Sequence, residues 1–225
     1  MDSVNWQLRY TTITTHMTFF HQAAWSWDRR WGWGAMLLPF VEQSNLYDDI
    51  DFHVGTAVGT NVDLIRRPVS VWRCPSDIGP QSFATTLVGA GGLQIAHGNY
   101  AANGEVMAGL TSVSLSDISD GLSNTIMLGE RAWNPDPAAT RFTSAWFGTL
   151  ASATNAGTDS IAHIELLPDR PINFWVGGGN CFSSFHAGGA HLALGDGSAR
   201  FVSEDIDSSV FAAAGTIAGG EQTSL

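Results

Sequence analysis

The sequence has no lysine. Its ten basic residues are all arginine, they face 21 acidic residues, and the formal net charge is −11. Because no basic stripe exists to displace counterions from a phosphate backbone, we do not expect nucleic acid as a partner. The same deficit disfavours docking on anionic lipid. We interpret the acidity as a solvated surface.

Long apolar runs and cysteine pairs are missing too. No stretch reaches the roughly 18 apolar residues of a transmembrane helix, and the N-terminus lacks the basic-then-apolar pattern of an export signal. The two cysteines, Cys74 and Cys181, lie far apart. The spacing excludes a Cys-x-x-Cys zinc ribbon or thioredoxin-type site. They form either one long-range disulfide or two buried thiols.

Glycine and aromatic residues are abundant instead. With 25 Gly, 9 Trp and 12 Phe, the composition predicts many short strands joined by glycine turns, with aromatic side chains filling the core. Charged residues are only 14% of the chain, too few for long surface helices. We predict a β-rich α+β fold in a single domain over residues 1–225. Within it, residues 1–24 are poorly defined and 134–180 form a long-loop insertion.

Four tryptophans, Trp25, Trp27, Trp31 and Trp33, lie at odd positions. In an extended chain this spacing would place all four indoles on one face. Such a row either stacks on sugar rings as a ligand contact or packs against the protein's own core. Packing is favoured, because large aromatic side chains are mostly buried.

Further local patterns predict individual elements. A short helix is expected from Pro39 to residue 50, because proline suits the first helical position and apolar residues recur on one side. The segment 69–77 is expected to be a strand, and the glycine-rich segment 78–98 a surface loop. Residues 125–130 are expected to form a buried strand, and Ser and Asp residues after 203 predict a capped C-terminal helix.

The segment 189–203 predicts a β-hairpin. Asp196-Gly197 is a favoured dipeptide for a two-residue type I′ turn, in which both central residues have positive φ. With that turn, the pairing places one set of side chains together on an apolar face: Leu192, Leu194, Ala199 and Phe201. Asp196 then has a structural role, accepting nearby N–H groups.

His186 precedes Gly188 and Gly189 in the loop that enters this hairpin. We expect it to hydrogen-bond backbone across the glycine bend and to pack under an aromatic ring such as Phe185. The alternative is a metal site of His186, His191 and Asp196. Ten residues of strand span about 33 Å, so this alternative requires the chain to double back. We therefore assign no metal here.

A second polar cluster raises the question of calcium. Asp117, Asp120, Gly121, Ser123 and Asn124 crowd one turn. Gly121 follows Asp117 by four residues, so the EF-hand spacing, which needs five, is not met. Asx-turns explain the same residues without an ion, and calcium stays the alternative.

Catalytic motifs are scarce. The sequence has no Gly-x-Ser-x-Gly elbow, no His-Glu-x-x-His and no phosphate-binding loop with lysine. Cys181 and His186 could be drawn as nucleophile and base, but no third group is evident to orient them. We expect a non-enzymatic protein with no catalytic residues and no cofactor.

Six blocks resemble those of a known family, the prepilin-processing-associated bacterial surface proteins with a His-x9-Asp-Gly signature. They occur in the family's order and span residues 31–221. The blocks are WGWGAMLLPFVEQSNLYDDIDF (31–52), VWRCPSD (71–77), NYAANGE (99–105), ISDGLSNTIMLGER (118–131), HAGGAHLALGDGSARF (186–201) and IAGGE (217–221).

The resemblance implies an extracellular or periplasmic head of pseudopilin type in the cell envelope, dominated by an antiparallel sheet. Its partners would be other pilin-like or envelope proteins. In that family a pilin-like leader and hydrophobic helix precede the head and supply the membrane contact, and this sequence lacks both. A further departure is that the family's His-Pro-Gly-Gly reads His186-Ala187-Gly188-Gly189 here. A solute- or glycan-binding module that uses the Trp25–Trp33 row and the long loops at 78–98 and 134–180 is the alternative function.

Overall fold

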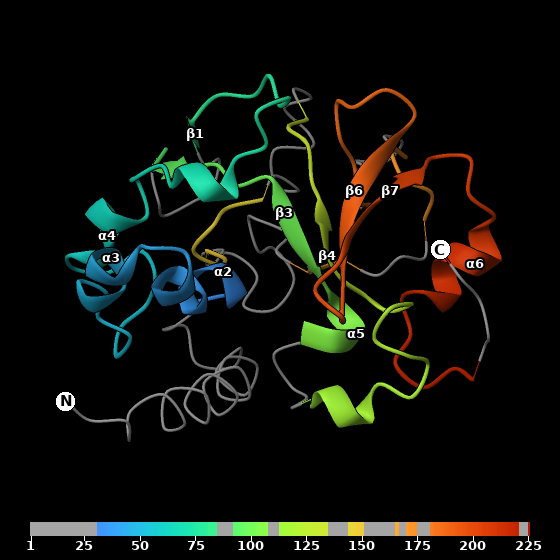
Figure 1. Ribbon diagram of the computed structural model, residues 1–225. Helices are drawn as coiled ribbons and strands as arrows, with labels where there is room; N and C mark the ends of the chain where they lie inside the picture. The colour runs from blue at the N-terminus through green and yellow to red at the C-terminus, as the bar shows by residue number, and fades with distance from the viewer. Residues whose placement is uncertain are drawn as a thin grey trace.

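The structure is a computed structural model that describes residues 31–84, 92–107, 113–134, 144–150, 165–166, 170–174, 181–220 and 225. Its centre is a five-stranded sheet with strand order β5-β3-β4-β6-β7 (Figure 1). β5 pairs in parallel with β3, and the pairings β3–β4, β4–β6 and β6–β7 are antiparallel. The strands are β3 (Tyr100–Asn103), β4 (Ile126–Glu130), β5 (Glu165–Leu166), β6 (Gly189–Leu194) and β7 (Ala199–Ser203).

Several short helices and a separate two-stranded sheet precede β3 in the chain, while α5 and η4 lie between β3 and β4 and α6 follows β7. Figure 1 shows α2, α3 and α4 on one side of the five-stranded sheet and α6 on the other. β1 (Ser82–Ala84) and β2 (Gln94–Ala96) pair antiparallel. The helices are α2 (Trp33–Met36), η2 (Leu38–Phe40), α3 (Ser44–Asp48), α4 (Asn61–Leu64), η3 (Ser70–Trp72), α5 (Gly104–Met107), η4 (Leu115–Asp117) and α6 (Ser208–Ala213).

This mixture of short helices and antiparallel strands confirms the α+β class that the composition predicts. Among the helices of the described ranges, none has the length and apolar character needed to cross a membrane. The shortness follows from the sequence, because glycines and turn residues interrupt every apolar stretch before a long helix can propagate.

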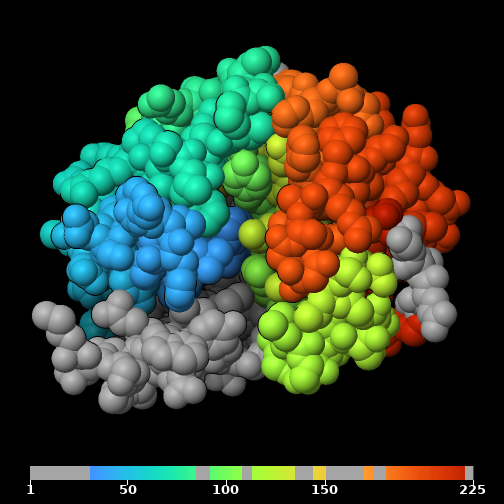
Figure 2. Space-filling view, viewed as in Figure 1, coloured from blue at the N-terminus to red at the C-terminus, as the bar shows by residue number. Residues whose placement is uncertain are grey.

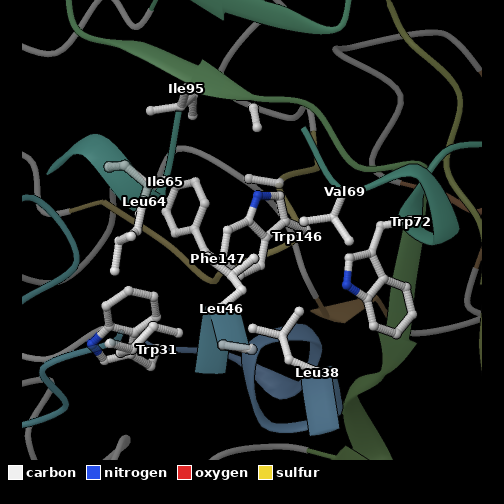
Figure 3. Close-up of a cluster of buried hydrophobic side chains, with 14 of the residues drawn as sticks. Trp31, Leu38, Leu46, Leu64, Ile65, Val69, Trp72, Ile95, Trp146 and Phe147 are labelled. Carbon is white, nitrogen blue, oxygen red and sulfur yellow. The ribbon is translucent and has the colours of Figure 1, made fainter. Parts of the chain in front are cut away.

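Two clusters of buried apolar side chains hold the fold together. The N-terminal cluster packs the short helices against residues 144–150 and β2, and Figure 3 shows Trp146 and Phe147 at its centre among Leu38, Leu46 and Ile65. The sheet cluster joins β4, β6 and β7 to α6 through Phe182 and Phe211, whose ring centroids lie 6.4 Å apart. Residues 144–150 thus belong to the core, although they lie inside the expected long-loop segment 134–180.

Trp31 and Trp33 lie inside the N-terminal cluster. Their exposed fractions are 2% and 5%, and Trp33 packs edge-to-face on Trp72 at 5.1 Å. Trp33 begins the helix α2, so the two residues do not continue one extended row. Both therefore lack the open indole face that sugar stacking needs. Trp25 and Trp27 lie outside the described residues.

Three local predictions need correction. The expected strand at 69–77 is instead the 3-10 turn η3, where burial of Trp72 against Trp33 overrides the β-propensity of the segment. The expected loop at 78–98 contains β1 and β2. The expected helix at 39–50 is divided into η2 and α3, because Glu42 between them has φ of +60°, which no right-handed helix accommodates.

Two other predictions are confirmed. The buried strand expected at 125–130 is β4. The capped C-terminal helix is α6, where the Asp207 carboxylate accepts hydrogen bonds from the Ser209 and Val210 amides at 2.8 and 3.3 Å.

The hairpin exists, but its register differs by one residue from the predicted one. His191 faces Phe201 and Leu192 faces Arg200, where a type I′ turn would pair His191 with Val202. As a result Val202 is buried and Phe201 is 49% exposed. A slip of one residue exchanges the faces of a strand, so the predicted apolar face is wrong for its second strand.

The turn explains the slip. The Gly197 amide donates to the Leu194 carbonyl at 3.0 Å, and the Leu194 amide donates to Ser198 at 2.8 Å. Gly197 has φ of +83°, whereas Asp196 does not have positive φ. This is a three-residue loop in which a type I turn is followed by a left-handed glycine. Asp196 still has the structural role predicted for it, because its Oδ1 accepts from the Ser198 amide at 2.9 Å.

Substitutions at Gly197 should separate backbone strain from side-chain crowding. A Cβ at this position would meet no atom within 4 Å, so the cost comes from φ alone. We expect Gly197→Val to lower the free energy of unfolding by about 1–2 kcal/mol, measured by urea denaturation. Gly197→Asn should cost clearly less, because asparagine tolerates left-handed backbone. Equal losses for the two variants would contradict this account.

Candidate functional site

Cys74 lies in the turn that follows η3, and its backbone is held from several sides. Its amide donates to Asn99 Oδ1 at 3.0 Å, and its carbonyl accepts from the Asp77 amide at 3.1 Å. Asp77 in turn accepts from the Trp133 amide and from Asn99 Nδ2, both at 2.7 Å. The Cys-Pro-Ser-Asp block therefore fixes the place of Cys74 against the start of β3 and the end of β4.

Glu130 is the last residue of β4, and its carboxyl group is buried. Oε2 accepts the backbone N–H of His191 on the neighbouring strand β6 at 2.7 Å, and His191 Nδ1 lies 3.4 Å from the same oxygen. Oε1 points away from this contact, toward Cys74 and His186. The two oxygens of one carboxyl group thus serve different neighbours.

His186 is placed by the bend that leads into β6. Its amide donates to Ser184 Oγ at 3.0 Å, and Ser184 Oγ donates to the Gly189 carbonyl at 2.5 Å. Gly188 has φ of +80°, and a Cβ on Gly189 would stand 2.1 Å from the Val202 carbonyl oxygen. Both glycines of the motif are therefore required by the backbone.

The three side chains converge. Cys74 Sγ lies 3.3 Å from Glu130 Oε1 and 3.6 Å from His186 Nε2, and Nε2 lies 3.2 Å from Oε1. Across the described part of the chain, this is the one group of His, Cys, Asp and Glu ligand atoms with the geometry to hold a metal ion. We call it the Cys74–Glu130–His186 cluster. The ring of His191 packs beside it, with its centroid 4.8 Å from that of His186.

Tertiary packing brings these residues together from distant parts of the chain. In Figure 2 the blue-to-teal surface of the N-terminal half meets the orange surface of the C-terminal hairpin. Cys74 comes from the first part, His186 from the second, and Glu130 from the strand between them. The cluster therefore lies where the two halves of the fold join.

The cluster is not arranged as a catalytic relay. In a nucleophile–base–acid triad, the carboxylate contacts the ring nitrogen opposite the one that takes the nucleophile's proton. Here His186 Nε2 faces both Cys74 Sγ and Glu130 Oε1. Burial raises the pKa of the Cys74 thiol, and the neighbouring Glu130 raises it further, which disfavours the reactive thiolate.

The structure separates the residues that the sequence grouped around His186. We expected the His186 side chain to hydrogen-bond the backbone across the glycine bend. Instead, its Nε2 faces Glu130 Oε1 in the cluster. Asp196 lies at the hairpin turn with Ser198, so Glu130 and not Asp196 is the carboxylate beside the two histidines. Both cysteines are free and buried. Cys181 Sγ donates to the Phe174 carbonyl at 3.2 Å, and the thiol beside His186 belongs to Cys74.

The polar turn considered for calcium is tied to the C-terminal segment. Asp120 accepts from the Gly219 and Gly220 amides at 2.8 and 2.9 Å and from Thr216 Oγ1 at 2.9 Å. Asp117 accepts from the Ser114 amide at 2.7 Å. The Asp-Gly block and the closing Gly-Gly-Glu block are therefore joined through one carboxylate.

Sequence reasoning missed Cys74 and Glu130 as site residues. Both belong to blocks that carry the family resemblance, and both have side chains that can bind a metal ion. That signal is present in the sequence. What is absent there is the topology that places residues 74, 130 and 186 at one point.

The family model SBP_bac_10, described as a protein of unknown function (DUF1559), matches residues 10–209. No curated protein and no solved structure matches the chain.

A buried histidine supports the backbone that carries Cys74. His97 is fully buried, and Arg73 contacts its Nδ1. Burial lowers the pKa of His97 to about 3, and the positive charge of Arg73 adds to this shift. In the unfolded chain His97 binds a proton below about pH 6.5, whereas in the folded chain it stays neutral until about pH 3. The contribution of His97 to the free energy of unfolding therefore falls as the pH decreases from 6.5 toward 3.

We therefore expect the wild-type free energy of unfolding to decrease with acidification more steeply than that of His97→Asn. The difference in slope should reach about 1.4 kcal/mol per pH unit at most, measured by urea denaturation between pH 7 and the acid limit of folding. Asparagine retains an acceptor near the position of Nδ1 but has no proton to gain. Parallel curves for the two proteins would show that His97 titrates normally.

Proposed function

Because the chain belongs to the DUF1559 family, whose model spans residues 10–209, we propose that it is the non-enzymatic head of a pilin-like protein of the bacterial cell envelope. In this role the head is a structural and protein-binding domain outside the cytoplasm, and its partners are other pilin-like or envelope proteins. The proposal is supported by the motif blocks, because their polar side chains form hydrogen bonds to the backbone of other segments.

These side chains are engaged in holding segments together. Asp77 joins the Cys-Pro-Ser block to Asn99 and Trp133. Asn103 Nδ2 donates to the Ile126 and Gly215 carbonyls, both at 2.8 Å, and Asp120 binds the Gly-Gly segment at 219–220. A pattern of this kind is what a rigid head requires, since each block fixes another block in place.

The alternative, a solute- or glycan-binding module, depends on the row Trp25, Trp27, Trp31 and Trp33 and on the long loops at 78–98 and 134–180. Burial of Trp31 and Trp33 removes two of its four indoles from contact with a ligand. No other observation among the described residues favours a saccharide, so the structural head is preferred.

The scaffold role of the blocks predicts the effect of Asp120→Ala. Loss of this carboxylate leaves the Gly219 and Gly220 amides without their acceptor and removes one of the two acceptors of the Thr216 hydroxyl. We expect a lower urea midpoint of unfolding. Asp63→Ala is the matched control, because Asp63 is an exposed aspartate whose ion pair with Arg66 is on the surface. Equal, small effects would argue against the scaffold role.

The location is tested in the bacterium that encodes the protein. We expect an antibody against the head to detect it in the envelope fraction, and protease added after outer-membrane permeabilisation to degrade it. A cytosolic protein followed in the same samples should stay protected. Co-fractionation with that cytosolic marker, with equal protection from protease, would rule the proposal out.

A further inference from the structure

The envelope role leaves the Cys74–Glu130–His186 cluster without an explanation. Elsewhere in the motif blocks, polar side chains hold backbone. Here a thiol, a carboxyl group and an imidazole from three distant segments direct one atom each toward a common point. Such a set combines the ligand types that zinc and related divalent ions prefer.

The separations fit the ligand shell of a tetrahedral ion. A Zn–S bond of about 2.3 Å and Zn–N or Zn–O bonds of about 2.0–2.1 Å place neighbouring ligand atoms roughly 3.3–3.6 Å apart. The cluster has 3.6 Å between S and N, 3.3 Å between S and O, and 3.2 Å between N and O. The last distance is at the long end for an N–H···O hydrogen bond. The three atoms thus form one triangular face of a coordination tetrahedron.

The surrounding contacts orient each ligand. Glu130 Oε2 accepts the His191 amide, which leaves Oε1 as a single coordinating oxygen. Asn99 fixes the Cys74 backbone, and Ser184 fixes that of His186. Outer contacts of this kind hold metal ligands in place before the ion arrives.

Size and access favour a single ion over an organic ligand. The hollow lined by Cys74, Glu130 and Ser184 has no room for an organic ligand, since small-molecule pockets enclose roughly 300 Å³ or more. Cys74 and Glu130 are buried, while the side chain of His186 is 28% exposed. His186 is therefore the member of the cluster with the most contact with solvent.

We propose that Cys74, Glu130 and His186 bind one divalent transition-metal ion of the zinc class, with a water molecule as the fourth ligand. Binding exchanges the thiol proton of Cys74 for the metal–sulfur bond and releases that proton to solvent. Three protein ligands and one exchangeable position distinguish this site from closed, four-ligand structural zinc sites. The site is independent of the proposed location in the envelope.

The test is a titration of chelator-treated, reduced protein with Co²⁺, followed by competition with Zn²⁺. We expect one equivalent to bind with a thiolate-to-cobalt charge-transfer band, and Zn²⁺ to abolish the band. Cys74→Ser should remove the band, and His186→Gln and Glu130→Gln should each weaken binding at least about tenfold. The matched controls are Cys181→Ser, the other buried cysteine, and His53→Gln, an exposed histidine. Both should bind as the wild type does.

A second measurement covers variants that fail to fold. In the Cys181→Ser background, Zn²⁺ should slow modification of the remaining thiol of Cys74 by a thiol reagent, while Mg²⁺ should not. The proposal is overturned if no stoichiometric ion binds, if cobalt binds without a thiolate band, or if Cys74→Ser and His186→Gln both retain wild-type affinity. None of these outcomes bears on where the protein resides, so the two proposals fail separately.

Discussion

The buried carboxyl group of Glu130 is the contact on which the arrangement of the two halves depends. Removing a carboxyl group from water is costly unless its oxygens find partners. Glu130 finds them on both sides. One oxygen binds the backbone of β6, and the other meets Cys74 from the N-terminal half and His186 from the bend before β6. The end of β4 therefore links segments that no strand pairing connects.

The glycines make that approach possible. Gly188 turns the chain with positive φ, and Gly189 lets β6 come so close to β7 that no side chain fits between them. As a result, the His186 side chain contacts Glu130 at the end of β4. On the opposite side of the cluster, Asp77 and Asn99 hold the Cys74 turn against β3 and residue 133. Asp77 and Asn99 thus hold in place the backbone that carries Cys74.

The two proposals assign different work to these two groups. Asp77 and Asp120 accept hydrogen bonds from backbone amides, and Asn103 donates to a backbone carbonyl. These contacts give the head its rigidity. Cys74, Glu130 and His186 direct one ligand atom each toward one another, and His186 is the partly exposed member of the three. A rigid frame around three converging ligands is the condition under which a metal ion binds without reorganising the chain.

Local chemistry in the sequence determined the α+β class, the strand β4, the Asp207 cap of α6 and the turn at Asp196-Gly197, because each depends on a few neighbouring residues. The tertiary structure alone decided the hairpin register, since a three-residue loop and a two-residue loop both accept Asp-Gly. It also decided that Trp72 ends a helical turn and not a strand, through its packing on Trp33. Above all, it brought residues 74, 130 and 186 together. Cys74 and Glu130 are 56 residues apart, and so are Glu130 and His186. Helix and strand periodicities relate only residues close in sequence, so the contact of these three side chains is defined by the tertiary fold alone.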